Sequence, residues 1–218
     1  MNLKPLVILI IDNLEGGYYH PEMKSKLKNG DSMLDSGETM YGLDRKHGKT
    51  LNTGADGVKF WNVIDMYYGT HHADTRYYND KADGRLIPKA VGDELKTYIY
   101  NIMSAQLQKN AAMLSEGSRK IVFNSPALTL QFLYACWNGS GNFQTFANVI
   151  NAAYANGKKS AEAYWDLIQK ERRKKGGLIA KGADILDNLK SKVENKTKKK
   201  WIVPLLLGAA LFFFLRKK

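Results

Sequence analysis

The sequence predicts a mainly α fold with a small irregular or weakly β region. In several segments apolar residues recur at the spacing of one helical face, whereas this spacing is lost between residues 23 and 51. With 218 residues and 44% hydrophobic content, the chain can bury a substantial core. The segments with helical spacing are 58–68, 93–114, 125–137, 142–155 and 160–173.

The first half of the chain is expected to begin with a buried helix. The apolar run 6–11 is too short to span a membrane and is cut off at Asp12. A second helix is expected at 58–68, where one face carries the apolar side chains of Val58, Trp61, Ile64 and Tyr68. Between these two segments, Asn29-Gly30-Asp31 is the strongest signal for a turn or hairpin.

The second half is expected to be a series of helices with recognisable ends. Asp93 is a candidate N-cap for the helix over 93–114. Ser125 and Pro126 supply an N-cap and a first-turn proline for the next helix, which the turn at 138–141 ends.

Positive charge is concentrated near the C-terminus. The formal net charge is +12, but residues 170–200 contain 12 Lys or Arg against four acids, and residues 216–218 add three more cations. Residues 1–169 therefore carry a net charge of only +1, so the folded part is nearly neutral and nucleic acid is not an expected partner.

The C-terminal segment has the pattern of a membrane anchor. Residues 201–215 have no charge and are flanked on both sides by three cations, which predicts a single-pass anchor in a lipid bilayer, with a packed core helix as the alternative. The expected organisation is a folded domain over 1–175, a basic amphipathic stalk over 176–199 and a transmembrane anchor over 200–216.

No metal or organic cofactor is expected. The single cysteine, Cys136, excludes an intramolecular disulfide and a four-thiolate metal site. The four histidines are His20, His47, His71 and His72. Adjacent histidines point in different directions, so they do not have the spacing of zinc ligands on a helix, and loop or surface positions are the better interpretation.

Two short segments carry the candidate chemistry. The first motif segment, residues 14–18, places Glu15 between an apolar run and two glycines followed by tyrosine. A glycosidase needs an acid that stays protonated near neutral pH, and a partly apolar cleft raises the pKa of a glutamate. The alternative is structural, with Glu15 ending a helix that Gly16 caps.

The second motif segment, residues 36–43, strengthens the catalytic interpretation. Glu-Gly-Gly-Tyr followed by Gly-x-Thr-x-x-Gly-Leu resembles the phage and bacterial muramidases of glycoside hydrolase family 108. The resemblance implies a lysozyme-like, mostly helical fold, cleavage of peptidoglycan glycan strands, and Glu15 as the general acid. It also implies that Gly16, Gly17 and Tyr18 shape the site and that Thr39 lies near the cleft.

The sequence departs from the family pattern before Thr39. The family usually has Asp-Pro-Gly-Gly there, whereas this chain reads Leu34-Asp35-Ser36-Gly37-Glu38. Glu38, Asp35 and Asp31 are alternative second carboxylates. Aromatic side chains next to glycine-rich turns are candidate sugar-stacking platforms, so the expected substrate-binding residues are Gly17, Tyr18, Asp35, Tyr41 and Trp137.

These features predict a membrane-anchored muramidase of phage type that cleaves the β-1,4 bond of the glycan strand during entry or lysis. Hydrolase and lytic transglycosylase outcomes both stay open. The expected location is an internal virion membrane or the host inner membrane, with peptidoglycan, the bilayer and virion proteins as partners. The alternative is a non-catalytic virion or membrane structural protein that keeps a lysozyme-like, glycan-binding fold.

Overall fold

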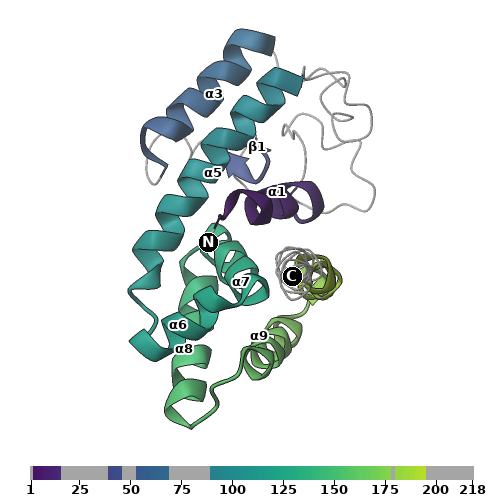
Figure 1. The fold of residues 1–218 in the computed structure, drawn as a ribbon. Coiled ribbons are helices and arrows are strands. Elements are labelled where there is room, and N and C mark those ends of the chain that lie inside the picture. The colour runs from purple at the N-terminus through teal and green to yellow at the C-terminus, as the bar shows by residue number, and fades with distance from the viewer. Residues whose placement is uncertain (1, 16–38, 46–52, 69–88, 178–179, 195–218) are drawn as a thin grey trace, which may run out of the picture. The chain divides into compact units, whose positions relative to one another are not determined.

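The chain is mainly helical with one small two-stranded sheet, as predicted (Figure 1). A computed structural model describes residues 2–15, 39–45, 53–68, 89–177 and 180–194. The chain divides into two compact units, Met1–Ala111 and Ala112–Lys218, and each is described separately.

The first unit contains three helices and a hairpin among its described residues. The helices are α1 (Lys4–Asn13), α3 (Gly54–Tyr68) and α5 (Lys89–Ala111), and both α1 and α3 pack against α5 (Figure 1). The hairpin is formed by β1 (Thr39–Met40) and β2 (Leu43–Asp44). The predicted turn at Asn29-Gly30-Asp31 lies outside the described residues.

Helix α1 forms as the apolar run predicts. Pro5 occupies its first turn, where the missing N–H would have no helical partner. Four apolar side chains, at Leu6, Val7, Ile10 and Ile11, recur at helical spacing and are buried. The helix ends at Asn13, and the backbone N–H of Leu14 still donates to the carbonyl oxygen of Ile10 at 2.9 Å.

The hairpin has a two-residue turn that local sequence signals do not reveal. Thr39 pairs with Asp44 and Met40 with Leu43 in an antiparallel register, which leaves Tyr41 and Gly42 in the turn. Their φ angles are 53° and 75°, so both are in the left-handed region that the favoured hairpin turns require. Glycine adopts this region freely, but a tyrosine there is backbone strain at a cost of about 1 kcal/mol or more.

Helix α5 begins earlier than predicted. It starts at Lys89, so Asp93 lies inside the first turns of the helix and is not its N-cap. The Asp93 carboxylate instead forms an ion pair with Lys89 one turn before it, which supports the additional turn. The buried face matches the prediction and carries Leu95, Ile99, Ile102, Met103 and Leu107.

The second unit is built around α7 (Pro126–Trp137). Its other labelled helices are α6 (Glu116–Asn124), α8 (Ser140–Ala155) and α9 (Ala161–Lys175), each of which contacts α7. The predicted start of α7 is confirmed, because the Ser125 side chain accepts a hydrogen bond from the backbone N–H of Leu128. Phe132 is fully buried, with ring centroids 6.2 Å from Phe123 and 5.0 Å from Phe146.

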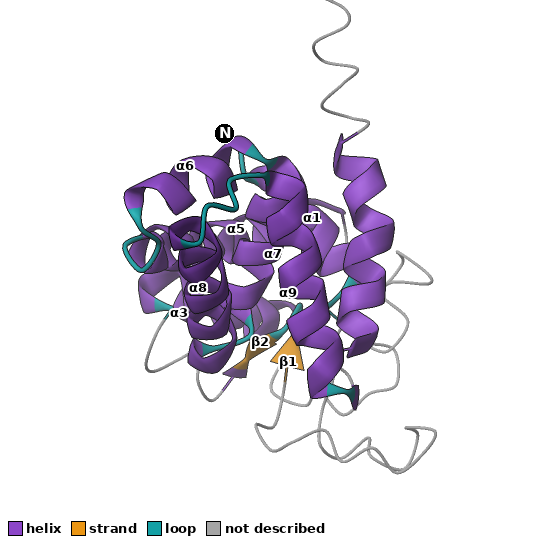
Figure 2. Ribbon diagram, turned by 90° about the horizontal axis from the view of Figure 1, so that it is seen from below, coloured by secondary structure: helices purple, strands orange, loops and turns teal. Residues whose placement is uncertain are grey.

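A further helix over 180–194 packs in the same unit (Figure 2). Its buried side chains are Ala183, Leu186, Leu189 and Val193, which recur at helical spacing. A Cβ added to Gly182 would lie 3.5 Å from the hydroxyl oxygen of Tyr134, so the helix comes close to α7. This part of the predicted stalk region 176–199 therefore packs onto the helical bundle.

The predicted membrane location is wrong, as the length and composition of the described helices show. None of the helices in the described ranges is long and apolar enough to cross a bilayer. Helix α5 has 23 residues, but charged side chains are spread along it. Residues 201–215, which suggested the anchor and the bilayer partner, lie outside those ranges and are fewer than the roughly 20 apolar residues that a usual bilayer core requires.

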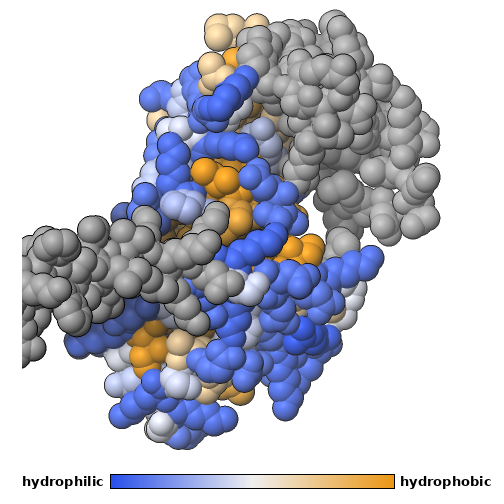
Figure 3. Space-filling view, turned by 45° about the vertical axis from the view of Figure 1, so that its right-hand side comes forward, coloured by the Kyte–Doolittle hydropathy of each residue, from blue (hydrophilic) through white to orange (hydrophobic). Residues whose placement is uncertain are grey.

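The visible face in Figure 3 is mostly hydrophilic, with smaller hydrophobic areas between the polar side chains. Among the described residues, the exposed large hydrophobic side chains are Val58, 39% exposed, and Met66, 81% exposed, both on α3. Val58 is thus not part of the buried face of α3, which carries Phe60, Trp61, Val63 and Ile64.

Candidate functional site

The predicted site residues are distributed over both units. Glu15, Thr39 and Tyr41 belong to the first unit, and Trp137, partly buried at the end of α7, belongs to the second. The remaining candidates lie outside the described residues; they are Gly17, Tyr18, Asp35 and Glu38, together with Asp31.

Glu15 lies two residues beyond the end of α1. Its backbone N–H donates to the carbonyl oxygen of Ile10 at 3.0 Å, which closes a wider turn than the α-helix itself. Glu15 is partly buried. The helix that precedes it, α1, packs one face into the core. This position combines a fixed backbone with partial access to solvent, as a carboxylic acid that donates a proton to a substrate requires.

Lys96 on α5 contacts a residue near the first motif segment and a residue of the second motif segment. Its Nζ atom lies 3.0 Å from Oδ1 of Asp12, three residues before Glu15. The same Nζ atom lies 5.9 Å from the ring centroid of Tyr41, two residues after Thr39. The end of α1 and the second motif segment therefore both approach the same lysine, although they are more than 20 residues apart in the sequence.

Tyr41 is covered by its own unit. The residue is only 6% exposed, and its ring lies edge-on to Phe60 with centroids 6.5 Å apart. Thr39, on the first strand of the same hairpin, is more exposed. In this conformation the hairpin presents Thr39 more openly than the Tyr41 ring, which was the predicted stacking platform.

Sequence reasoning missed the ion pair that fixes the end of the hairpin. Arg45 follows β2 directly, and its two terminal nitrogens donate to the two carboxylate oxygens of Asp65 on α3, at 2.9 and 2.7 Å. The guanidinium carbon also lies 4.4 Å from the ring centroid of Trp61. An arginine fork paired with a carboxylate and stacked on an indole fixes position and orientation.

Arg45→Lys should therefore lower the free energy of unfolding by about 1–2 kcal/mol, because lysine can neither pair bidentately nor stack flat on the indole. Chemical denaturation measures this loss. Lys120→Gln, which removes one partner of an exposed ion pair with Glu116, should change the value by less than about 0.5 kcal/mol. Equal effects of the two variants would contradict an anchoring role for Arg45.

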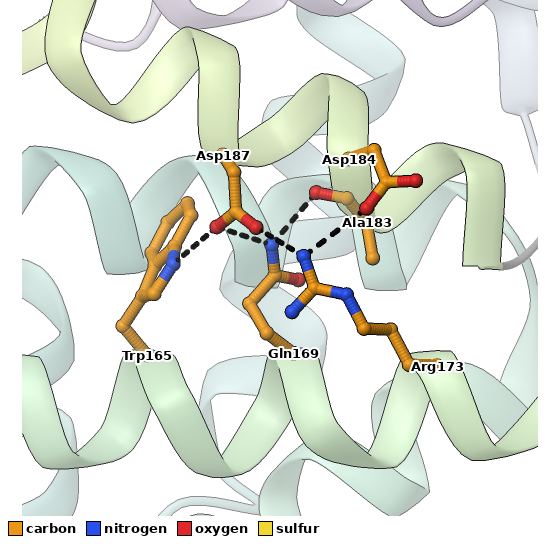
Figure 4. Close-up of polar contacts among 6 residues, drawn as sticks. All are labelled: Trp165, Gln169, Arg173, Ala183, Asp184 and Asp187. Carbon is orange, nitrogen blue, oxygen red and sulfur yellow. Dashed lines mark hydrogen bonds and ion pairs between the residues drawn. The ribbon is translucent and has the colours of Figure 1, made fainter.

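A second polar cluster joins α9 to the helix over 180–194 (Figure 4). Oδ1 of Asp187 accepts hydrogen bonds from Nε1 of Trp165 at 2.8 Å and from Nε2 of Gln169 at 2.7 Å. Arg173 forms ion pairs with both Asp184 and Asp187. These hydrogen bonds and ion pairs cross between the two helices and hold them together.

The pKa of Asp187 reflects these hydrogen bonds and ion pairs. Desolvation raises the pKa, but the hydrogen bonds from Gln169, Trp165 and Arg173 together outweigh it and hold the pKa below the usual value of 3.8. The ionised Asp187 therefore stabilises the folded protein fully at pH values above its pKa in the unfolded chain. This stabilisation is lost as the pH falls through its lower pKa in the folded protein.

Asp187→Ala should lower the free energy of unfolding at neutral pH by about 1–2 kcal/mol, since three donors lose a charged acceptor that is still 37% exposed. The difference from the native protein should shrink as the pH falls below about 4. Urea titrations across this range measure both effects. Asp166→Ala, at an exposed position of α9, is the control, and a pH-independent difference would contradict the interpretation.

The part of the chain that the structure describes holds no group of three or more side chains suited to a metal ion. All four histidines lie outside that part. The expectation of a metal-free site thus stays a prediction.

Comparison with known protein families, with characterised proteins and with solved structures finds no match to this chain.

Proposed function

We propose that this protein is a muramidase, which cleaves the β-1,4 glycosidic bond of peptidoglycan with Glu15 as the general acid. The proposal rests on the resemblance to glycoside hydrolase family 108, and the observation that supports it is that Lys96 contacts both Asp12, three residues before Glu15, and Tyr41 in the second motif segment. A lysozyme-like arrangement, with the acid after a first helix and a hairpin before a longer helix, is part of this proposal and agrees with the order α1, hairpin, α3, α5.

The chemistry needs two groups with different tasks. Glu15 in its protonated form gives its proton to the glycosidic oxygen as the bond to the anomeric carbon breaks. The resulting oxocarbenium-like centre takes up water, whose proton passes to a base. Thr39 on the hairpin is the candidate residue that orients that water, and Glu38 and Asp35 are the candidate carboxylates that stabilise the positive centre.

The partial burial of Glu15 supports its assignment as the acid. A partly buried position shields the carboxyl group in part from solvent and still leaves it accessible to a substrate. The structural alternative is a glutamate that only ends a helix, and loss of murein cleavage on substitution of Glu15 distinguishes the two roles.

The test is digestion of purified murein by the full chain, with reducing ends and soluble fragments measured over time. Release of fragments with free reducing ends supports a hydrolase, and release of anhydro ends supports a lytic transglycosylase. Binding to murein without any fragment release would overturn the catalytic proposal and select the non-catalytic, glycan-binding alternative.

A further inference from the structure

Arg172 is a buried cation that has no carboxylate partner among the residues that the structure describes. It lies on the buried face of α9 with 9% exposure, where an apolar residue would continue the stripe formed by Tyr164, Trp165 and Ile168. Its Nη2 atom is 3.5 Å from the carbonyl oxygen of Gln131, at the limit of a hydrogen bond, and its Cζ atom is 5.2 Å from the ring centroid of Tyr134. Within the described ranges, its Nε atom has no hydrogen-bond partner.

Such an arrangement is costly to the folded protein. Desolvation lowers the pKa of Arg172, yet a guanidinium stays charged at neutral pH. Nearby Gln131 is fully buried, and in the described part of the chain neither atom of its amide has a partner. Buried polar groups are almost always satisfied, so the unmet hydrogen-bonding capacity of Arg172 and of the Gln131 amide within the described residues is unfavourable for the folded protein.

A small pocket opens beside Arg172, between α8 and α9. Its interior is about 20 Å³, which accommodates a water molecule or the oxygen atoms of one acidic group. Arg172 lines it together with Asn142, Thr145, Phe146, Ile168, Glu171 and Lys175.

The charges around the pocket favour an anion. Arg172 and Lys175 are cationic, whereas the only acid in the lining, Glu171, forms an ion pair with Lys174. Asn142 and Thr145 lie in the first two turns of α8, where the helix dipole is positive. Phe146 and Ile168 supply apolar contacts next to these groups.

We propose that this pocket binds the carboxylate of a short peptide, with the carboxylate seated against Arg172 and a small apolar side chain against Phe146 and Ile168. A planar carboxylate matches the guanidinium fork, and the small interior admits an acidic group but not a whole residue. The identity of the peptide rests on the proposed function: it is the stem peptide of peptidoglycan, which ends in a free carboxylate on alanine. The pocket then recognises the peptide of the substrate, and Glu15 acts on the glycan.

Calorimetric titration of the full chain with N-acetyl-D-alanyl-D-alanine tests the proposal. The C-terminal amide of the same dipeptide should bind at least about tenfold more weakly, because it lacks the charge. Acetate, which offers a carboxylate without a peptide, should also bind more weakly than the dipeptide because it lacks the apolar contacts. Equal binding of dipeptide and acetate, or of dipeptide and amide, would overturn the assignment.

Arg172→Met should weaken dipeptide binding by at least about tenfold while it raises the Tm of the ligand-free protein. The rise is expected because an apolar side chain replaces an unpaired buried charge, and a purely structural arginine would give the opposite shift. Lys170→Gln, at an exposed position of the same helix, removes one cation outside the pocket and should change binding less than about twofold. Unchanged binding by Arg172→Met would overturn the proposal.

Digestion of murein and of peptide-free glycan chains separates this inference from the proposed function. Retained dipeptide binding with no cleavage of either polymer would overturn the muramidase proposal and leave the carboxylate pocket standing. Cleavage of murein by a protein that does not bind the dipeptide would overturn only the pocket.

Discussion

Glu15→Gln is expected to lower the rate of murein cleavage by about 10²–10⁴-fold, the usual contribution of a general acid. Glutamine keeps the size of the side chain and its capacity to hydrogen-bond, but it has no proton to give to the leaving glycosidic oxygen. The release of reducing ends from purified murein, measured at several substrate concentrations, should show a loss in kcat with little change in KM.

Asp12→Asn is the matched control for this experiment. It removes one negative charge three residues earlier and weakens the partly exposed ion pair with Lys96, so it should alter the rate only slightly. Thermal unfolding of both variants establishes that they are folded. A Glu15→Gln protein as active as the native one would contradict the catalytic assignment, whatever the effect of Asp12→Asn.

Trp61→Ala should cost about 3–5 kcal/mol in the free energy of unfolding. The indole is fully buried on α3, contacts Phe60 with ring centroids 5.3 Å apart, and supports the guanidinium of Arg45. Its removal leaves a cavity in the first unit and frees the arginine that fixes the end of the hairpin. Urea denaturation followed by circular dichroism measures the loss.

Met66→Ala on the same helix provides the comparison. The methionine is also a large apolar residue, but it is 81% exposed, so its truncation should change the free energy of unfolding by less than about 0.5 kcal/mol. Similar losses for the two variants would show that burial in the first unit is not what gives Trp61 its effect.

Helices with strong local signals were predictable. The start of α7 depends on one serine side chain and one proline ring, and both act within a single turn, so the sequence alone contains the cause. The start of α5 was not predictable in this way. An aspartate is a good N-cap, but here it pairs with Lys89 inside the helix, and the choice between these roles depends on the turn that precedes it.

The candidate site also combines features that local sequence predicts with features that depend on tertiary contacts. The sequence placed Glu15 at the end of a helix and related it to Thr39 by pattern, but no local rule predicts a tyrosine in the left-handed region of a two-residue turn. That strained turn is held by contacts from other elements, including Phe60 on α3 and Lys96 on α5. The membrane prediction depended on the charge pattern of one terminal segment and had no tertiary observation behind it.

The sequence by itself determined the helical class, most of the buried helix faces and the two motif segments, because helical periodicity and motif residues are properties of neighbouring positions. Only the tertiary structure decided that Lys96 contacts both Asp12 and Tyr41, that Arg45 anchors the hairpin to α3, and that Arg172 is buried without a carboxylate partner within the described ranges. These facts depend on contacts between residues far apart in the chain, which periodicity and capping rules do not encode.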